Sequence, residues 1–208
     1  MRGCRRRGSG TFVNLKYVTV TETKGEKNMT DQNSGSNSSE EGDVKEFICR
    51  QAETQGKVLF EDSFSSGIDN WVMERWSEEE ASMKWNKEEK HLEVKTVQGT
   101  DGVMVWCRKE LPGNFIFEYD VTPLSESGFF LIFFCVKGSD GRDILSPEIL
   151  NDRSDPTLFK KYTKSGINCY HISYRRDRSA TCNLRKNSGM DLLKQQKLDY
   201  VLPRNKTV

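Results

Sequence analysis

The hydrophobic and polar positions change pattern at about Lys57, and beyond it short alternating or apolar segments recur between turn-forming residues. Residues 82–85 and 91–97 flank a polar five-residue segment and predict a β-hairpin. Residues 115–121 alternate cleanly, whereas residues 128–136 are almost wholly apolar and predict a central strand buried on both faces. Further strands are expected over residues 58–60, 68–76, 103–107, 167–175 and 181–187.

Regular short strands, together with one long polar loop region over residues 137–165, predict an all-β fold. The arrangement expected is a two-sheet antiparallel sandwich or jelly roll. The N-terminal part differs, because residues 1–27 are basic without periodicity and residues 30–43 are rich in Ser, Asn, Gly and acidic residues. We therefore predict that residues 1–56 are a disordered or extraneous N-terminal extension and that residues 57–208 form the domain.

Composition limits the classes of partner. The chain has 208 residues, of which 35% are hydrophobic, so it can hold one well-buried domain. Its 32 basic and 31 acidic residues give a net charge of +1, which offers no reason to expect nucleic acid or an anionic membrane as partner. No apolar run approaches the roughly 18 residues of a membrane span, and none near the N-terminus fits a secretory signal. We expect a soluble, cytoplasmic protein.

The six cysteines form no CxxC pair and no His/Cys cluster, so a structural zinc site is not expected. Four of them lie in apolar strand patterns, as free cysteines do in a reducing compartment. The Asp- and Gly-rich segment 138–143 is either a Ca²⁺-binding loop or a plain turn, and it lacks the spacing of an EF-hand. We expect no metal or cofactor, with Ca²⁺ at this loop as the alternative.

The strands over residues 167–175 and 181–187 are unusually rich in Asn, Tyr, His and Arg. Amides and hydroxyls match the hydroxyl groups of sugars, and aromatic rings pack on the apolar faces of pyranose rings. Bases also gather here, which suits a ligand with carboxylates or, alternatively, a solvated rim. Between residues 160 and 190 the only acid is Asp177, and the bases are Lys160, Lys161, Lys164, Arg175, Arg176, Arg178, Arg185 and Lys186.

Seven residues are candidates for ligand binding, and those on the two polar strands are expected to act together on one sheet face. Arg175, Asn183 and Arg185 come first, because the planar fork of arginine matches a carboxylate such as that of galacturonate. Surface salt bridges are the alternative for the arginines. The tyrosines of residues 167–175 fit packing and ligand stacking equally, and Trp106 is either a core residue or a platform for a sugar ring. The candidates are Trp106, Asn168, Tyr170, Tyr174, Arg175, Asn183 and Arg185.

Three residues are candidates for catalysis. Glu118 and Asp120 alternate with aromatic residues, so both carboxylates project from one strand face about 6.5–7 Å apart. That separation suits glycoside hydrolysis, and the alternative is a pair of solvent-facing charges. His171 lies on the strand face opposite Tyr170 and Tyr174, where it is either a buried structural histidine or a general base.

Several segments together resemble the YesU-like family of bacterial proteins of unknown function. The resemblance covers about residues 57–190, and its most specific part is the run from Asn168 to Tyr174. It implies a concanavalin A-like, galectin-like jelly roll of the lectin/glucanase type. It also implies a carbohydrate connection, because the family tends to occur beside genes for degrading rhamnogalacturonan pectin. The segments that carry it are Leu59–Phe64, Ile68–Trp71, Phe117–Leu124, Ile167–Arg175 and Thr181–Asn187.

The chain departs from this family at two places. Similar proteins often have a His after the Tyr that precedes the polar strand, whereas here Tyr162 is followed by Thr163. They also continue for several strands beyond this region, whereas residues 193–208 are polar and weakly patterned. We therefore expect a jelly roll that lacks its C-terminal strands and leaves sheet edges exposed.

The resulting hypothesis is a carbohydrate-binding protein for acidic oligosaccharides derived from pectin (rhamnogalacturonan). The first alternative is a glycoside hydrolase or lyase on the same oligosaccharides that uses Glu118 and Asp120 with His171 nearby. The second is a structural or interaction module whose polar strand residues bond only within the protein. Fold resemblance alone does not decide among the three.

Overall fold

The computed structural model describes residues 12–22, 56–75, 81–97, 102–148, 162–163, 166–175, 181–197 and 202–208. Over these residues the fold is all-β, as the sequence predicts, and the strand pairs are antiparallel. Within the same ranges no helix is long and apolar enough to cross a membrane. The strands are β1 (Phe12–Glu22), β2 (Val58–Asp62), β3 (Trp71–Glu74), β4 (Ala81–Asn86), β5 (His91–Thr96), β6 (Met104–Cys107), β7 (Phe115–Pro123), β8 (Phe129–Gly138), β9 (Ile167–Arg175), β10 (Thr181–Asn187) and β11 (Asp191–Lys197).

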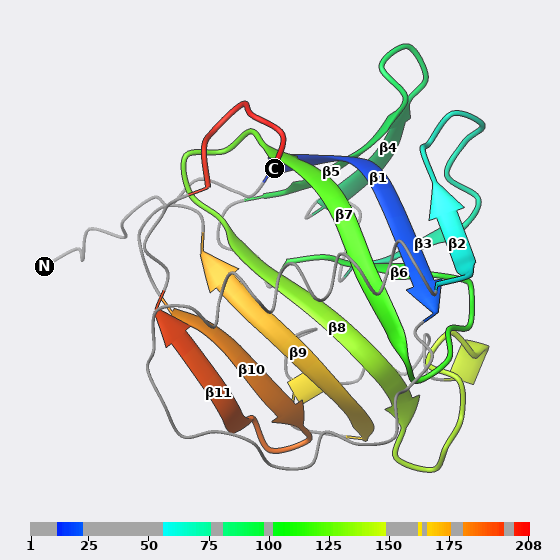
Figure 1. Ribbon diagram of the computed structural model, residues 1–208, viewed down its shortest axis with the longest axis vertical. Helices are drawn as coiled ribbons and strands as arrows, with labels where there is room; N and C mark the ends of the chain where they lie inside the picture. The colour runs from blue at the N-terminus through cyan, green and yellow to red at the C-terminus, as the bar shows by residue number, and fades with distance from the viewer. Residues whose placement is uncertain are drawn as a thin grey trace, which may run out of the picture.

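The strands form three sheets (Figure 1). The five-stranded sheet has the order β2-β1-β5-β4, with β7 also paired to β1. The four-stranded sheet has the order β11-β10-β9-β8, and β3 pairs with β6 in a two-stranded sheet. In the view of Figure 1, β3 and β6 lie behind the layer that contains β7 and β8. The four-stranded sheet carries most of the polar residues singled out from the sequence.

β1 occupies a central place in the largest sheet. It pairs with β7 from Val13 to Glu22 and, on its other edge, with β5 and then β2. Val18 and Val20 are buried in the core and Thr19 between them is partly exposed, whereas Thr21 is buried after a register shift that follows Val20. The expectation of disorder for residues 1–56 is therefore wrong for this segment. The alternating pattern of residues 12–22 leads to a strand because β2, β5 and β7 supply hydrogen-bonding partners. Residues 1–11 and 23–55 lie outside the described residues.

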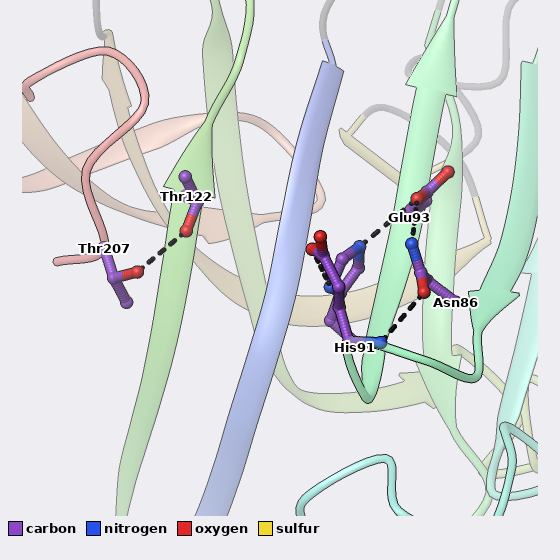
Figure 2. A network of polar contacts seen from close by, with 6 residues as sticks. Asn86, His91, Glu93, Thr122 and Thr207 are labelled. Carbon is purple, nitrogen blue, oxygen red and sulfur yellow. Dashed lines mark hydrogen bonds and ion pairs between the residues drawn. The ribbon is translucent and has the colours of Figure 1, made fainter.

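The predicted hairpin is confirmed as β4 and β5, joined by a turn over residues 87–90. His91 begins β5 and is buried, and its Nε2 donates to Glu93 Oε1 at 3.2 Å (Figure 2). Asn86 Nδ2 donates to the same Glu93 oxygen at 3.1 Å, and this bond is the main reason why the Glu93 pKa is lowered. The turn itself is fixed by the Glu89 N–H, which donates to Asn86 Oδ1 at 3.0 Å.

A buried carboxylate, that of Asp62 at the end of β2, organises the segment between β2 and β3. Asp62 accepts hydrogen bonds from the Phe64 N–H at 2.8 Å, from Asn70 Nδ2 at 3.1 Å and from Trp71 Nε1 at 2.9 Å. Phe64 and Trp71 pack beside each other in the core with Val18. The Leu59–Phe64 and Ile68–Trp71 segments therefore build the loop and core around Asp62, since a buried carboxylate needs such partners.

β8 differs from the doubly buried central strand expected over residues 128–136. It ends its sheet, pairing with β9 alone among the described strands, and no residue from Phe129 to Lys137 is fully buried. A cleft of about 1600 Å³ borders this strand and is lined by side chains of β1, β6, β7 and β8. Phe129 is 47% exposed and Phe117, across the cleft, is 38% exposed. The strand was predicted correctly, but its central position was wrong.

The C-terminal part is more regular than its polar sequence indicates. β11 pairs with β10, although all of its residues are exposed. Residues 202–208 run along the end of β7, where Val208 and Val121 exchange backbone hydrogen bonds of 2.9 and 3.0 Å. The side chains of Thr122 and Thr207 are hydrogen-bonded at 2.9 Å in the same place (Figure 2). This segment covers part of one edge of β7, while β1 covers the other.

Candidate functional site

The two faces of β9 carry different chemistry, as alternation predicts. Ile167, Cys169, His171 and Ser173 are buried, and the residues between them are more accessible. Residues directly opposite each other in an antiparallel pair share a face. We call the side that carries Asn168, Tyr170, Ile172 and Tyr174 the aromatic face. The polar face carries Cys169, His171 and Ser173 of β9 with Asn183, Arg185 and Asn187 of β10.

The register corrects one part of the sequence analysis. The proposed ligand residues were expected together on one sheet face. Asn183 pairs with Ser173 and Arg185 pairs with His171, so Asn183 and Arg185 lie on the polar face. The tyrosines of β9 lie on the other side of the same sheet. Alternation within a strand fixes which residues share a face, but only the pairing between strands shows which faces are joined.

On the aromatic face the rings stack on one another. Tyr170 stacks on Phe134 of β8, with 5.7 Å between ring centroids, and Tyr174 stacks on Phe130 at 5.3 Å. The Tyr174 hydroxyl is 2.5 Å from the hydroxyl of Tyr119 on β7. These contacts favour the packing alternative for both tyrosines. Asn168 is exposed at the far end of the strand.

A cavity of about 360 Å³ lies where the aromatic face meets β7. Tyr119, Tyr174 and Arg175 contribute its polar groups, and the remaining lining is mostly apolar. The Arg175 guanidinium also lies over the ring of Phe129, 5.9 Å from its centroid. Two of the residues predicted to bind a ligand therefore meet at this cavity.

The polar face contains a buried histidine held by an amide. His171 is 1% exposed, its Nδ1 lies 2.8 Å from Asn187 Nδ2, and its ring lies 5.2 Å from that of Phe133. Burial lowers the His171 pKa, and the positive charge of Arg185 lowers it further. Asn187 Nδ2 also donates to Cys169 Sγ at 3.2 Å, whereas the buried Asn187 Oδ1 has no hydrogen-bond partner among the described residues. Burial raises the Cys169 pKa, so this thiol stays protonated at neutral pH.

Arg185 is half-buried and lies directly across from His171. Its Nη1 donates to the Met190 carbonyl oxygen at 2.7 Å, which closes the turn between β10 and β11. That turn includes Gly189 at φ +114°, a conformation that side-chain-bearing residues rarely adopt. In the part of the chain that the structure describes, no acidic side chain forms an ion pair with Arg185.

Neighbouring residues extend the polar face toward the sheet edge. Asn183 Nδ2 donates to Thr181 Oγ1 at 3.2 Å, and Asn183 Oδ1 accepts from Gln195 Nε2 at 2.8 Å. Charge over β10 and β11 is strongly one-sided, since Asp191 is their one acid. The bases of the two strands are Arg185, Lys186, Lys194 and Lys197.

Trp106 lies in the core beside residues that sequence analysis missed. It is 7% exposed, and its ring lies 5.1 Å from that of Tyr162 and 6.2 Å from that of Phe133. Its Nε1 donates to Glu74 Oε2 at 3.2 Å, and the Tyr162 hydroxyl donates to the same oxygen. Both ring contacts and the indole bond therefore go to the protein itself, which favours the core alternative over a sugar platform. Nothing in the sequence indicated that Glu74 would be buried, apart from its place in a short strand.

The three catalytic candidates do not meet. Glu118 and Asp120 are exposed on β7, across from Thr19 and Tyr17 of β1. His171 is buried on β9 in a different sheet, and no described contact joins it to either carboxylate. Glu118 and Asp120 thus lie on a solvent-facing surface, which fits the alternative that they are a pair of exposed charges.

The loop considered for Ca²⁺ contains engaged carboxylates. Asp140 accepts from the Arg142 backbone N–H at 3.1 Å and pairs with its Nε at 2.5 Å, and the backbone bond is the main cause of the lowered Asp140 pKa. Asp143 Oδ1 accepts from the Leu145 N–H at 2.9 Å. Among the described residues no group of three His, Cys, Asp or Glu side chains is placed to hold a metal ion.

Of the predicted site residues, the structure brings together His171, Asn183 and Arg185. Asn187 joins them, although sequence analysis did not single it out. The sequence could have indicated Asn187, because Asn183, Arg185 and Asn187 lie two residues apart along one strand and must share a face.

Comparisons with known proteins give a family but no activity. The sequence model of a family described as "Domain of unknown function (DUF1961)" matches residues 57–206. A curated relative, "Uncharacterized protein YesU" of Bacillus subtilis (strain 168), is 31% identical over 107 residues, which are 49% of this chain and 47% of the relative. The match therefore spans about half the length of that relative. No solved structure matches the chain.

Proposed function

We propose that this chain, which belongs to the family described as a domain of unknown function (DUF1961), binds acidic oligosaccharides. The proposal rests on the geometry of the polar face. Arg185 would hold the carboxylate of a sugar acid, and Asn183 with Ser173 would bond sugar hydroxyls. The sequence resemblance to the YesU-like family makes pectin-derived oligosaccharides the first acidic ligands to consider.

One observation carries this proposal. Arg185 is half-buried, and among the described residues its protein hydrogen bond goes to the Met190 carbonyl oxygen rather than to a carboxylate. An arginine removed from water is normally paired with an acid, because desolvating an unpaired charge is costly. A guanidinium has five N–H donors in a planar fork, so most of them remain for a bidentate carboxylate.

The surroundings support an anionic ligand over a neutral one. The positive charge of Arg185 acts on the neighbouring His171 ring and lowers its pKa, after burial as the larger cause. Lys197 adds positive charge on the same face, because it lies opposite Thr181 on β11. A field of one sign raises the local concentration of ligands of opposite charge and speeds their association.

The test is isothermal titration calorimetry with galacturonate-containing oligosaccharides, in parallel with the same oligosaccharides after methyl esterification. We expect binding of the acid form and none of the ester, because esterification removes the carboxylate that Arg185 would hold. Arg185→Ala should weaken binding about 10- to 100-fold, the range for one charged hydrogen-bonded contact.

Lys186→Ala is the matched control. Lys186 is the next residue along β10, is exposed, and points to the opposite side of the sheet. Equal loss of affinity in both variants would show that only overall charge matters and would defeat the proposal. Mass spectrometry of the same samples should find the sugars unchanged, whereas smaller products would make the protein an enzyme.

A further inference from the structure

We propose that Asn187 holds His171 as the neutral imidazole with its proton on Nε2, which makes His171 a hydrogen-bond donor to the bound ligand and not a general base. The part that concerns the ligand rests on the proposed function above. The assignment of the proton to Nε2 does not, because it follows from contacts within the protein.

The first step is the direction of the hydrogen bond between the two side chains. Asn187 Nδ2 lies 2.8 Å from His171 Nδ1, and an amide nitrogen can only donate. His171 Nδ1 must therefore be the acceptor, which leaves the ring proton of a neutral imidazole on Nε2. The second N–H of the same amide donates to Cys169 Sγ at 3.2 Å, so both amide hydrogens have acceptors.

The second step is the charge of the ring. His171 and Asn187 are each 1% exposed, so water does not stabilise an imidazolium there. Arg185 faces the ring from β10, Phe133 packs on it from β8, and Cys169 lies beside it on β9. None of these neighbours carries a negative charge at neutral pH. A second positive charge next to Arg185 would therefore be disfavoured.

The third step is what the remaining nitrogen can do. The two nitrogens of an imidazole point away from each other, so Nε2 lies on the side of the ring away from Asn187. No described residue forms a hydrogen bond with it. Because the lone pair of Nδ1 is already engaged, His171 has no free acceptor with which to take a proton from a substrate.

Together these steps narrow the ligand class. Arg185 supplies a charged fork and His171 a neutral N–H donor from the neighbouring strand. Such a site fits a monoanionic carboxylate, which accepts through both oxygens and needs no proton transfer. The polar face is then a recognition surface for a uronic acid residue rather than the centre of an acid–base reaction.

The experiment is long-range ¹H–¹⁵N NMR of the histidine side chains in the whole chain at pH 8. The sequence has two histidines, so His91→Gln assigns the His171 signals without further labelling. We expect Nδ1 to resonate as an unprotonated ring nitrogen and Nε2 as a protonated one. The reverse pattern would mean that the Asn187 amide presents Oδ1 to the ring, and it would overturn the proposal. An imidazolium pattern would overturn it as well.

A variant that replaces the donor checks the cause. Asn187→Asp presents only acceptor oxygens to Nδ1, so the proton should move to Nδ1 and the His171 pKa should rise. If Asn187 had only a structural role, Asn187→Asp would change the stability of the protein but would leave the tautomer of His171 unchanged. An unchanged ¹⁵N pattern in a folded Asn187→Asp variant would count against Asn187 as the positioning residue.

Ligand binding is tested separately with galacturonate. His171→Gln keeps an N–H donor close to the Nε2 position and should bind within about threefold of the unchanged protein, whereas His171→Leu should lose about tenfold. If the tautomer is as expected but galacturonate does not bind, the proposed function fails while the assignment of His171 stands. If both variants bind equally well, His171 is not a donor to the ligand.

Discussion

The two faces of the four-stranded sheet offer the most instructive comparison in this molecule. The aromatic face carries the tyrosines that resemble a sugar-stacking surface, yet Tyr170 and Tyr174 stack on phenylalanines of β8. The polar face is far more buried, yet it holds a half-buried arginine with no described acidic partner and a buried amide oxygen without a hydrogen bond. Abundance of suitable residue types is therefore a weaker guide to a binding site than unmet hydrogen-bonding capacity.

The polar face is also the one more firmly supported by packing. Phe133 contacts His171, Tyr162 and Trp106, so the histidine rests on the same core that buries Glu74. Groups used for recognition are most precise when their own rotamers are fixed by packing. On the aromatic face the described ring contacts of β8 are pairs, since Phe134 stacks on Tyr170 and Phe130 stacks on Tyr174.

The largest expected difference between the faces comes from two neighbouring phenylalanines. Phe133→Ala should destabilise the protein by about 3 kcal/mol, because three ring contacts of the core are lost, whereas Phe134→Ala on the other face should cost about 1 kcal/mol. Urea unfolding of the two variants measures both values. Equal losses would mean that the polar face is no better supported than the aromatic one.

A smaller difference is expected between two asparagines of the sheet. Asn187→Ala should cost about 1–3 kcal/mol, because it leaves buried His171 Nδ1 without its donor. Asn168→Ala should change the unfolding free energy by less than about 0.5 kcal/mol, because Asn168 is exposed on β9. Thermal and urea unfolding would contradict the comparison if Asn168→Ala were the more harmful change.

The pH dependence of stability should distinguish the faces as well. The folded-state pKa of His171 is lowered, so below the unfolded value of about 6.5 the unfolded chain binds a proton that the folded chain does not. Stability should therefore fall as pH drops from about 6.5 toward the folded-state pKa, by at most about 1.4 kcal/mol per pH unit.

Urea unfolding at a series of pH values measures this slope. His171→Gln removes the titrating group and should flatten the curve, while His91→Gln serves as the control for the second histidine. A slope that is unchanged in His171→Gln would assign the effect to other groups.

The smallest expected effect concerns the aromatic face. Tyr174→Phe removes one hydroxyl of the pair with Tyr119 and should cost about 1 kcal/mol of stability. Affinity for galacturonate-containing oligosaccharides should stay within about twofold, because Tyr174 lies on the face away from Arg185. Calorimetry that finds a large loss would move the binding site to the aromatic face and its cavity.

Local pattern predicted much of the fold. The β4–β5 hairpin and the two faces of β9 follow from period-2 spacing, which depends only on the strand itself. The edge position of β8 did not follow, because an all-apolar strand looks the same whether a second layer or an open cleft covers it. The strand status of residues 12–22 depended on partners distant in sequence.

The candidate site was partly predictable for the same reason. His171, Asn183 and Arg185 were proposed from residue type, and their meeting on one face required the register of β9 against β10. Tyr170 and Tyr174 were proposed on equally good chemistry, but the rings of Phe130 and Phe134 that stack on them belong to another strand. Asn187 was overlooked although its spacing from Arg185 gave its face.

The long pairing of β1 with β7 has a consequence for synthesis in the cell. β1 leaves the ribosome before β7, and its partner Phe115 at the end of the pairing follows roughly 90 residues after Glu22, or about 5–20 s at ordinary translation rates. During that interval the edge of β1 that pairs with β7 is open, and an open edge of a β-strand readily joins other chains. Soluble yield should therefore depend on how fast the chain is made, and slower growth with abundant chaperone should favour the protein.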